Sequence, residues 1–520
     1  MHLVTRLGYL AAACLLAGAV AGENLPRFGD ISATSVPTGI HNAKALGAVG
    51  DGSSDDATNL QSILSAISSA GGELFLPCGK YKAATALTAT IAAGKSVRIQ
   101  GVAPECVTIY FPNNSGLSFT FASPFSSIHI RDVTITGGLG NGSGNSAISL
   151  SYGSFYGNPA LTAQNDFTNV TVRGDDAFNG ADYWTNCYTI TNVSNVNWFG
   201  GSCLGSSSRK GSGVLIQGDA AVRSFGVAYN FSSTTFTSVE TGITYGSWVQ
   251  GVTLNQVNIS NSTTGIRAPS VNTGVLHGLN IVNSQFGVVG RSIDIEVSIG
   301  GIGIVNSLFE VDRNVCAISL VNVAGAAIIG NQFNGNSGDT LFNNQGICLA
   351  GGGFNTIVGN ALGALTTAVD IASGSNNNID GSNTYNTIAR NVSDGGASSN
   401  VGYQRLGSPL YMAGVQWAVN SGGNNILYTG DGANQGAFLS SSFAILRGPS
   451  VLMQNFGGAT TYGTFSTSGL KLGMGRYNAP LHTPASSSEA CTVGDFVDDA
   501  SFHYVCTAAN TWKRAGLSAF

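Results

Sequence analysis

The chain is short of charged side chains. Of its 520 residues, 22 are Lys or Arg and 27 are Asp or Glu, so that only 9% are charged, whereas roughly 25% is usual for soluble domains. The formal net charge is −5, which argues against the basic surface of a nucleic-acid-binding protein. With only 12 prolines and no strict three-residue glycine period, neither a collagen-like nor a proline-linker architecture is expected.

Long apolar runs are missing after the first 21 residues. A membrane-spanning helix needs about 20 mostly apolar residues, and no later segment offers them. At the start, His2 and Arg6 are followed by a mostly apolar stretch that ends in Ala19-Val20-Ala21, a small-x-small cleavage pattern. We interpret residues 1–21 as a signal peptide and predict an exported protein (periplasmic, extracellular or at the cell surface) with no membrane span after cleavage.

The cysteines fit export. Eight lie beyond Cys14, which falls inside the expected signal peptide, and an even number favours disulfides in an oxidising compartment. Eight cysteines allow 105 connectivities, so the pairing stays open, as does the alternative of free buried thiols. Pairing nearest neighbours predicts four local bridges: Cys78–Cys106, Cys187–Cys203, Cys316–Cys348 and Cys491–Cys506.

Glycine is abundant instead, at 72 residues, about twice its usual share of roughly 7%. From about residue 128, short runs of Val, Ile, Phe and Thr alternate with Asn, Gly and Ser. The asparagines that follow six of these runs are 22, 23, 25, 29 and 23 residues apart: Asn261, Asn283, Asn306, Asn331, Asn360 and Asn383. A repeat of this length with strand composition predicts a solenoid, in which coils stack at about 4.8 Å.

We therefore predict an all-β fold, a right-handed parallel β-helix, which is the known architecture for coils of this length. Gly and Asn supply the left-handed turns between strands, and stacked Asn side chains can hydrogen-bond along the axis. The isoleucines of the repeat should face inward and stack on successive coils: Ile259, Ile281, Ile304 and Ile328.

The open ends of such a stack need caps. After Asp55 and Asp56, Leu60, Ile63, Leu64 and Ile67 recur at helical spacing, which predicts an N-terminal capping helix up to Gly71. We expect the β-helix to span residues 40–395. A β-rich extension (400–481), a short linker (482–488) and a small C-terminal module (489–520) should follow.

The N-terminal segment also resembles a known family. Residues 42–52 (NAKALGAVGDG), Asp55-Asp56-Ala57 and residues 76–81 (LPCGKY) strongly resemble the start of pectate-lyase-superfamily β-helix proteins. That superfamily includes rhamnogalacturonase/epimerase-like domains and many phage tailspikes. The resemblance covers residues 42–110 and implies the β-helix fold and a polysaccharide partner. In that family the segment forms the entry and cap, so it implies no catalytic role for Asp51 or the two aspartates that follow.

The reaction motifs of the family are not matched. The Asn-Thr-Asp strand and Gly-His-Gly turn of polygalacturonases and the Trp-Ile-Asp-His segment of pectate lyases are absent from the sequence. Only Leu276-His277-Gly278-Leu279 approaches one of them, and we interpret His277 as structural. The tail, around residues 494–518, looks like terminal segments of bacterial and phage surface proteins.

A first candidate site follows from the repeat. Six residues after Asn261, Asn283 and Asn306 stand Arg267, Val289 and Asp312, so Arg267 and Asp312 should lie two coils, roughly 10 Å, apart. Nearby charges are concentrated for such a chain. We predict Glu310 and Asp312 as catalytic carboxylates, alone or with Asp294, and three arginines as substrate-binding: Arg267, Arg291 and Arg313.

Two chemistries suit that cluster. Inverting glycosidases hold two carboxyls about 6.5–9.5 Å apart and retaining ones about 5–5.5 Å. A lyase would instead neutralise a uronate with Arg, or with Ca²⁺ held by carboxylates, and would use a base to remove the C5 proton. We predict no specific metal-ligating residues, and whether the protein needs a cofactor, such as Ca²⁺ for a lyase, stays open. The alternative is a ladder of solvated or paired charges that protects the stack from edge aggregation.

A second candidate site is the run Arg173-Gly174-Asp175-Asp176, followed by Asp182, Tyr183 and Trp184. We predict Asp175 and Asp176 as catalytic, and Tyr183 and Trp184 as substrate-binding, because aromatic rings stack on sugar faces. The alternative is an ordinary Gly-Asp-Asp turn.

These features indicate an exported polysaccharide-degrading enzyme, a glycoside hydrolase or polysaccharide lyase, that acts on an extended glycan along the β-helix face. The alternative is a non-catalytic glycan-binding surface or phage-tail-like protein. Acidic residues that converge in one groove would favour the enzyme. The substrate and the oligomeric state stay open.

Overall fold

The structure is a computed structural model that describes residues 39–519, with interruptions. The residues outside the described part are 1–38, 114, 139–144, 154–161, 179, 219–225, 275, 336–342, 377, 389, 396–399, 402–409, 413–414, 420–424, 430–435, 439–449, 455–460, 467–468, 473–480 and 520. The expected signal peptide and Cys14 therefore lie outside the described residues. The chain divides into two compact units after Gly436.

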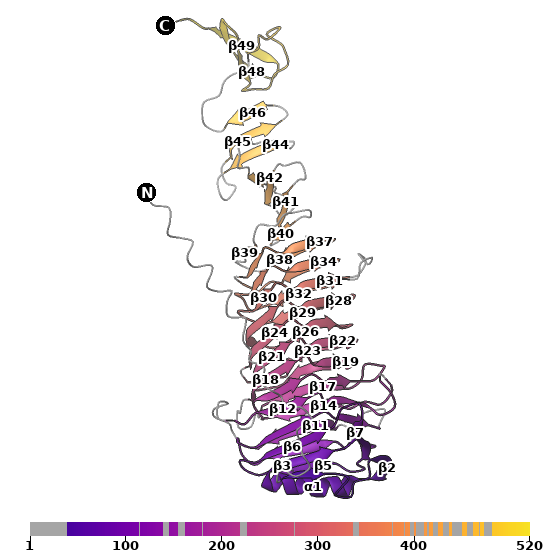
Figure 1. Cartoon of the computed structure of the whole chain (residues 1–520). Coiled ribbons are helices and arrows are strands. Elements are labelled where there is room, and N and C mark those ends of the chain that lie inside the picture. Colours follow the sequence, from indigo (N-terminus) through magenta and orange to yellow (C-terminus); the bar gives the residue numbers. More distant parts are fainter. Residues whose placement is uncertain are drawn as a thin grey trace, which may run out of the picture. The chain divides into compact units, whose positions relative to one another are not determined.

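Three long sheets form the first unit (Figure 1). The first sheet has 14 strands, all paired in parallel. In sheet order they are β1 (Ile40–Asn42), β3 (Gly72–Leu76), β6 (Ser96–Gly101), β9 (Ser127–Arg131), β12 (Asn165–Thr168), β15 (Val196–Phe199), β18 (Gly226–Ser232), β21 (Val249–Asn255), β24 (Leu276–Val282), β27 (Ile299–Val305), β30 (Ala327–Ile329), β33 (Thr356–Val358), β36 (Ile379–Gly381) and β39 (Asn400–Val401).

The second sheet has 13 strands, also parallel throughout. They are β2 (Asp51–Asp55), β4 (Gly79–Lys82), β7 (Val107–Phe111), β10 (Thr134–Gly137), β13 (Thr171–Gly174), β16 (Ser202–Leu204), β19 (Thr235–Thr237), β22 (Asn258–Ser260), β25 (Gln285–Gly287), β28 (Leu308–Val311), β31 (Gln332–Gly335), β34 (Ala361–Gly363) and β37 (Thr384–Asn386).

The third sheet has 16 strands and is parallel as far as β40, after which β41 and β42 add antiparallel. In chain order they are β5 (Leu87–Ile91), β8 (Leu117–Phe121), β11 (Ser146–Tyr152), β14 (Asn186–Thr191), β17 (Ser212–Gln217), β20 (Thr241–Tyr245), β23 (Thr264–Ala268), β26 (Ile293–Ile295), β29 (Cys316–Val321), β32 (Gln345–Ala350), β35 (Thr367–Ile371), β38 (Arg390–Asp394), β40 (Leu410–Met412), β41 (Val415–Val419), β42 (Asn425–Thr429) and β43 (Gly436–Phe438).

Because nearly every third strand of the chain joins the same sheet, one coil consists of one strand from each sheet. The protein is thus a parallel β-solenoid, and the predicted all-β fold class is confirmed. Two antiparallel three-stranded sheets follow in the second unit. They are β44 (Ser450–Gln454), β45 (Thr461–Ser466) and β46 (Gly469–Leu472), then β47 (Phe496–Asp498), β48 (Phe502–Ala508) and β49 (Thr511–Gly516).

The isoleucine prediction is confirmed for three residues and wrong for the fourth. Ile281, Ile304 and Ile328 are buried and occupy one register row of the first sheet, where the preceding coil contributes Leu254. Ile259 is also buried, but it lies in the second sheet, where it stacks on Phe286. The reason is that Asn261 follows a strand of the second sheet, whereas the later asparagines follow strands of the first.

A buried asparagine ladder stabilises the turn between the first and second sheets. Asn331 Nδ2 donates to Asn360 Oδ1 at 3.0 Å, and Asn360 Nδ2 donates to Asn383 Oδ1 at 3.0 Å. The residue that precedes each of these asparagines adopts a left-handed conformation, with φ of 67° at Gly330, 69° at Gly359 and 55° at Ser382. The side chains therefore satisfy backbone groups that a sharp turn would leave unpaired.

The predicted cap is α1 (Ala57–Ala70), which lies at the end of the stack beside β3 and β5 (Figure 1). Its buried face includes Leu60, Leu64 and Ile67. The Asp56 side chain makes no capping bond to the helix. Asp55 Oδ1 instead accepts the Ala57 N–H at 3.2 Å. Among the described residues, no helix has the length and apolar character to cross a membrane.

All four predicted disulfides are confirmed: Cys78–Cys106, Cys187–Cys203, Cys316–Cys348 and Cys491–Cys506. The first three are spaced by roughly one coil or less, because a cysteine can reach only its own coil or an adjacent one. Disulfides of this kind are typical of proteins outside the cytosol.

Candidate functional site

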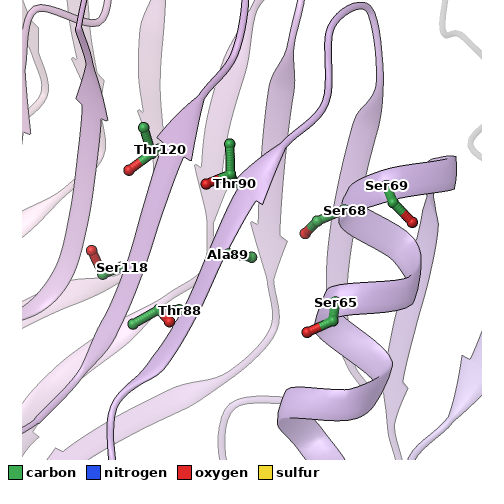
Figure 2. A pocket seen from close by; sticks show the side chains of 8 residues that line it. All are labelled: Ser65, Ser68, Ser69, Thr88, Ala89, Thr90, Ser118 and Thr120. Carbon is green, nitrogen blue, oxygen red and sulfur yellow. The ribbon is translucent and has the colours of Figure 1, made fainter.

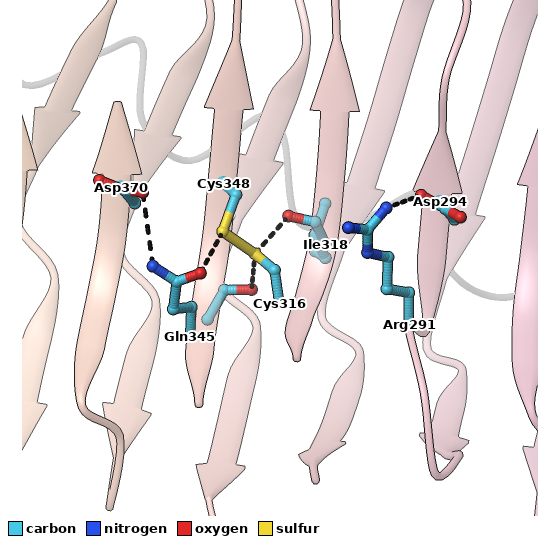
Figure 3. The surroundings of a disulfide bond; sticks show 8 residues. Arg291, Asp294, Cys316, Ile318, Gln345, Cys348 and Asp370 are labelled. Atoms are coloured by element: carbon cyan, nitrogen blue, oxygen red, sulfur yellow. Dashed lines mark hydrogen bonds and ion pairs between the residues drawn. A yellow bond between two sulfur atoms is a disulfide. The ribbon is translucent and has the colours of Figure 1, made fainter. Parts of the chain in front are cut away.

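Two of the three arginines of the first candidate site, Arg267 and Arg291, lie in ion pairs on or beside the third sheet. Arg267 Nη2 is 2.9 Å from Glu296 Oε1, and Arg291 Nη1 is 2.6 Å from Asp294 Oδ1. Figure 3 shows the second pair to the right of the Cys316–Cys348 disulfide. In the register, Arg267 faces Asp294 of the next coil. The predicted row that aligned Arg267 with Val289 and Asp312 is therefore wrong, because Asn261 and Asn283 belong to different corners of the coil.

The carboxylates of that site lie elsewhere on the coil. Glu310 belongs to β28 of the second sheet, where it is exposed and lies in register with Gly287. Asp312 follows at the end of the strand, and its Oδ1 accepts the N–H of Arg313 at 2.7 Å. These three residues and the Arg267 and Arg291 ion pairs thus occupy different sheets. The sequence grouped them, but the register does not align them in one row.

The residues of the second candidate site contact charged and polar side chains from other coils. Asp175 directly follows β13, and we call residues 173–184, from the end of β13 onward and with residue 179 outside the described part, the 173–184 loop. Asp175 Oδ2 is 2.8 Å from Lys80 Nζ, and its Oδ1 accepts a hydrogen bond of 2.8 Å from Thr136. The Lys80 ammonium also lies 4.4 Å from the centre of the Tyr110 ring. Lys80 is 95 residues away in sequence, but the coils place it only three second-sheet strands from β13.

Asp176 has a different environment. Its carboxylate accepts the N–H groups of Ala177 at 3.0 Å, of Ala181, and of Asp182 at 3.3 Å. Slight burial raises its pKa, but these backbone hydrogen bonds outweigh that effect and leave the pKa below its usual value. Its carboxylate packs against Gly180, where a Cβ would come within 2.3 Å. Asp176 therefore shapes the 173–184 loop, and a catalytic role for it stays a prediction.

The 173–184 loop returns Asp182 to the position beside Asp175. A Cβ on Gly174 would lie 2.3 Å from the Asp182 carbonyl oxygen, so only glycine permits this approach. Burial, followed by the charges of Asp176 and Asp175, raises the pKa of Asp182. Burial and the charges of Asp175 and Asp182 likewise raise the pKa of Tyr110. The loop thus brings together two carboxyl groups whose pKa values shift in opposite directions, that of Asp176 downward and that of Asp182 upward.

The two aromatic residues predicted for this site are not equivalent. Trp184 is only 1% exposed, packs against Phe111 in the core and donates its Nε1 hydrogen to the Arg173 carbonyl. Its predicted role as a sugar platform is wrong, because the ring faces the core. Tyr183 is half-buried. The exposed ring is Phe178, which is 69% exposed and lies beneath the Arg173 guanidinium at 4.6 Å.

Sequence reasoning gave no site role to Lys80, Tyr110 or Phe178 and mentioned Asp182 only as a neighbour. The register was the missing information, since Tyr110, Thr136 and Arg173 stack on successive coils of the second sheet.

A third charged cluster was missed entirely. On the first sheet, Asp166 accepts a short hydrogen bond from His129 and lies 2.9 Å from Arg131 Nε. Partial burial raises the pKa of Asp166. The hydrogen bonds and charges of His129 and Arg131 outweigh this effect and bring the pKa down to about 2. A signal existed in the alternating pattern of Ser127–Arg131, which places His129 and Arg131 on one face. Asp166 lies one coil later, beyond the reach of a local pattern.

Asp166 should make stability depend on pH. Its pKa is depressed in the folded state relative to about 3.9 in the unfolded chain. The stabilisation is therefore present above pH 4 and lost as pH falls from about 4 to 2, at a cost of about 1–2 kcal/mol after solvent screening. Denaturant midpoints between pH 2 and 6 should show this loss in wild type. Asp166→Asn should remove it, and Glu105→Gln, at an exposed carboxyl, should retain it. Parallel curves for wild type and Asp166→Asn would contradict the assignment.

Within the described residues, no three His, Cys, Asp or Glu side chains gather as a metal-ligand group.

No family model matches the chain. A protein of Klebsiella phage K5-2 described as "Depolymerase 1, capsule K30/K69-specific" is 52% identical over 50 residues, which are 10% of this chain and 6% of that protein. The chain therefore matches only a small part of that relative.

Solved structures resemble the chain in fold. Tailspike protein 3 of bacteriophage CBA120 is 16% identical, with a TM-score of 0.48 over 84% of this chain and 69% of its own. DFA-IIIase of Arthrobacter chlorophenolicus A6, without its lid, is 14% identical, with a TM-score of 0.46 over 66% of this chain and 94% of its own. The Streptococcus pneumoniae surface adhesin PfbA is 12% identical, with a TM-score of 0.43 over 76% and 99%.

Proposed function

We propose that this protein hydrolyses an extended polysaccharide at the 173–184 loop, with Asp182 as general acid and Asp175 as general base or nucleophile. The observation that carries the proposal is the contrast between these two carboxyls. Asp175 is ion-paired with Lys80 and accepts a hydrogen bond from Thr136, so a cation and a hydroxyl hold its carboxylate in place. The pKa of Asp182 is raised by burial and by its acidic neighbours, which favours retention of its proton.

Hydrolysis of a glycosidic bond needs two carboxyl groups with different roles. The acid protonates the leaving oxygen, while an ionised carboxylate activates water or attacks the sugar. Lys80 and Thr136 hold the Asp175 carboxylate in place. The exposed ring of Phe178 and the face of Tyr110 can stack on sugar rings, and Arg173 supplies a cation beside Phe178.

The substrate class is supported by one relative. The Klebsiella phage protein is named as a capsule-specific depolymerase, and capsules are extended polysaccharides. Export and attachment to a surface through the C-terminal module belong to the same proposal.

Two other assignments remain in the proposal as alternatives. Glu310 and Asp312 are two residues apart at the end of an extended strand, so their Cα atoms are separated by about 6.6 Å and the pair could act on one bond. Non-catalytic glycan binding is the second alternative. The Arg267–Glu296 and Arg291–Asp294 ion pairs favour this binding role over catalysis by these residues, since the paired charges already neutralise each other.

The test incubates the full chain with a panel of capsular and plant polysaccharides and follows two signals. Hydrolysis produces reducing ends alone, whereas elimination also produces the ultraviolet absorbance of an unsaturated uronate. We expect reducing ends without that absorbance. Ultraviolet absorbance would overturn the hydrolysis proposal in favour of a lyase. If neither reducing ends nor absorbance appear but the polysaccharide binds, the protein is a binding protein.

A further inference from the structure

One arginine beside the acidic pair has no acidic partner. The guanidinium of Arg173 lies over the exposed Phe178 ring, and its Nη1 donates a hydrogen bond of 2.7 Å to the Gly174 carbonyl. No carboxylate of the described residues lies within ion-pair distance of it, although three aspartates belong to the same loop. Four other arginines of the solenoid do lie in ion pairs with carboxylates: Arg98, Arg131, Arg267 and Arg291.

The Arg173 guanidinium keeps N–H groups available to a ligand. Its Nε is buried and has no hydrogen-bond partner within the described part of the chain, so it serves no ligand. Its Nη2 also has no partner among the described residues but, unlike Nε, is open to solvent. A partly desolvated cation without a counter-ion is unfavourable, and a planar guanidinium matches the geometry of a carboxylate. Nη2 therefore offers two N–H donors to an incoming carboxylate.

The register places Arg173 at one end of a row on the second sheet. The row runs over successive coils through Lys82, Tyr110, Thr136 and Arg173, so three steps of about 4.8 Å separate its ends by roughly 14 Å. At the other end, Lys82 Nζ donates to the Ser53 carbonyl at 3.2 Å. The row thus carries a cation at each end.

The carboxylate nearest to Lys82 in the register does not neutralise it. Asp55 is the register partner of Lys82, but its Oδ1 accepts the N–H groups of Ala57 at 3.2 Å and of Ala84 at 3.1 Å. Asp175 is hydrogen-bonded to Thr136 and therefore lies beside the row, between its two cations. A polysaccharide that follows the row would meet the proposed catalytic carboxylate and both cations.

The hollow at the capped end of the solenoid offers no such cation. It lies between α1 and the strands β5 and β8, and its eight lining residues are all Ser, Thr or Ala (Figure 2). Some of its hydroxyls are already used within the protein, since Ser65 Oγ donates to the Gln61 carbonyl at 2.8 Å and Ser69 Oγ to the Ala66 carbonyl at 2.9 Å. An acidic glycan is therefore expected at the second-sheet row and not at this hollow.

We propose that the protein selects an acidic polysaccharide, and that the Arg173 guanidinium binds a carboxylate on a sugar unit next to the cleaved bond. A uronate unit and a pyruvate ketal on a sugar both present this group. The inference deepens the proposed function and rests on it for the position of the cleaved bond. Selection by charge has a readout of its own, because it is a property of binding.

The experiment is isothermal titration calorimetry of the full chain carrying Asp182→Asn, which lacks the proposed general acid. The probes are polygalacturonate, a glucuronate-containing capsular polysaccharide, a pyruvylated capsular polysaccharide and, as the neutral comparison, dextran. We expect at least one acidic probe to bind and dextran not to bind. Reduction of the carboxyl groups to alcohols should weaken that binding about 10- to 100-fold, the effect of one hydrogen bond between charged groups. Mild acid, which removes only pyruvate, should have the same effect if the carboxylate is a pyruvate ketal and none if it is a uronate.

Substitutions connect the carboxylate to Arg173. Arg173→Gln should weaken binding of the native acidic probe about 10- to 100-fold and leave binding of its reduced form unchanged, because the two changes remove the same interaction. Arg173→Lys keeps the charge but not the planar group, so its affinity should be intermediate. Lys95→Gln, which removes an exposed cation just before β6 of the first sheet, should bind as the parent protein does. Equal melting temperatures verify that the variants fold.

Cleavage by the wild-type protein is read separately from binding. Reducing ends released from dextran alone would overturn the charge inference and leave the hydrolysis proposal standing. Charge-selective binding through Arg173 without reducing ends would do the reverse. The inference is also overturned if no acidic probe binds, if Arg173→Gln binds the native acidic probe as tightly as the parent, or if it weakens native and reduced probes equally, which would indicate a purely structural role.

Discussion

Replacing Asp182 with Asn is expected to lower the rate of polysaccharide cleavage by about 100-fold or more, with the fold intact. Asparagine keeps the shape of the side chain but has no proton to give to the leaving oxygen. The measurement is the initial rate of reducing-end release on any polysaccharide that the wild-type protein cleaves, with circular dichroism to verify folding. Asp175→Asn should have an effect of the same order, because the pair acts as a unit.

The controls distinguish the two carboxylate pairs. Asp312→Asn should leave the rate nearly unchanged if the 173–184 loop is the active site. A large loss in Asp312→Asn with normal rates in Asp182→Asn would transfer the assignment to Glu310 and Asp312. The pH profile gives a second reading. Since the charge of Asp176 helps to raise the pKa of Asp182, Asp176→Asn should move the alkaline limb of the profile to lower pH.

Replacing Phe309 with Ala is expected to destabilise the solenoid by about 3–5 kcal/mol. Phe309 is fully buried between two rings, with centroid distances of 5.0 Å to Phe286 and 4.8 Å to Phe333. Solenoid stability is approximately a sum over neighbouring coils, so loss of this ring weakens two interfaces at once. Chemical denaturation of wild type and variant measures the difference.

The matched control is Phe125→Ala, at a phenylalanine that is 58% exposed. Its free energy of unfolding should change by no more than about 0.5 kcal/mol. Equal losses in both variants would show that the stacked phenylalanines do not carry the stability of the coils.

Sequence patterns predicted the features that depend on local chemistry or on neighbouring coils. Helical spacing predicted α1, and the period of 22 to 29 residues predicted the solenoid. The nearest-neighbour pairing of the cysteines was confirmed, and in the solenoid it holds for three bridges because residues one coil or less apart in sequence are neighbours in space. The prediction for Ile259 was wrong because two corners of the coil have the same Asn-rich chemistry, and sequence spacing alone does not tell them apart.

The sequence by itself thus determined the fold class and the cap, since both depend on short-range periodicity and on a core that alternating apolar residues must fill. Only the tertiary structure decided which charged groups meet. It placed Lys80 against Asp175, paired Asp166 with His129 and turned Trp184 into the core. The physical reason is that coil lengths vary. A single inserted loop shifts every later residue relative to its neighbour on the next coil, and contacts between side chains depend on that register.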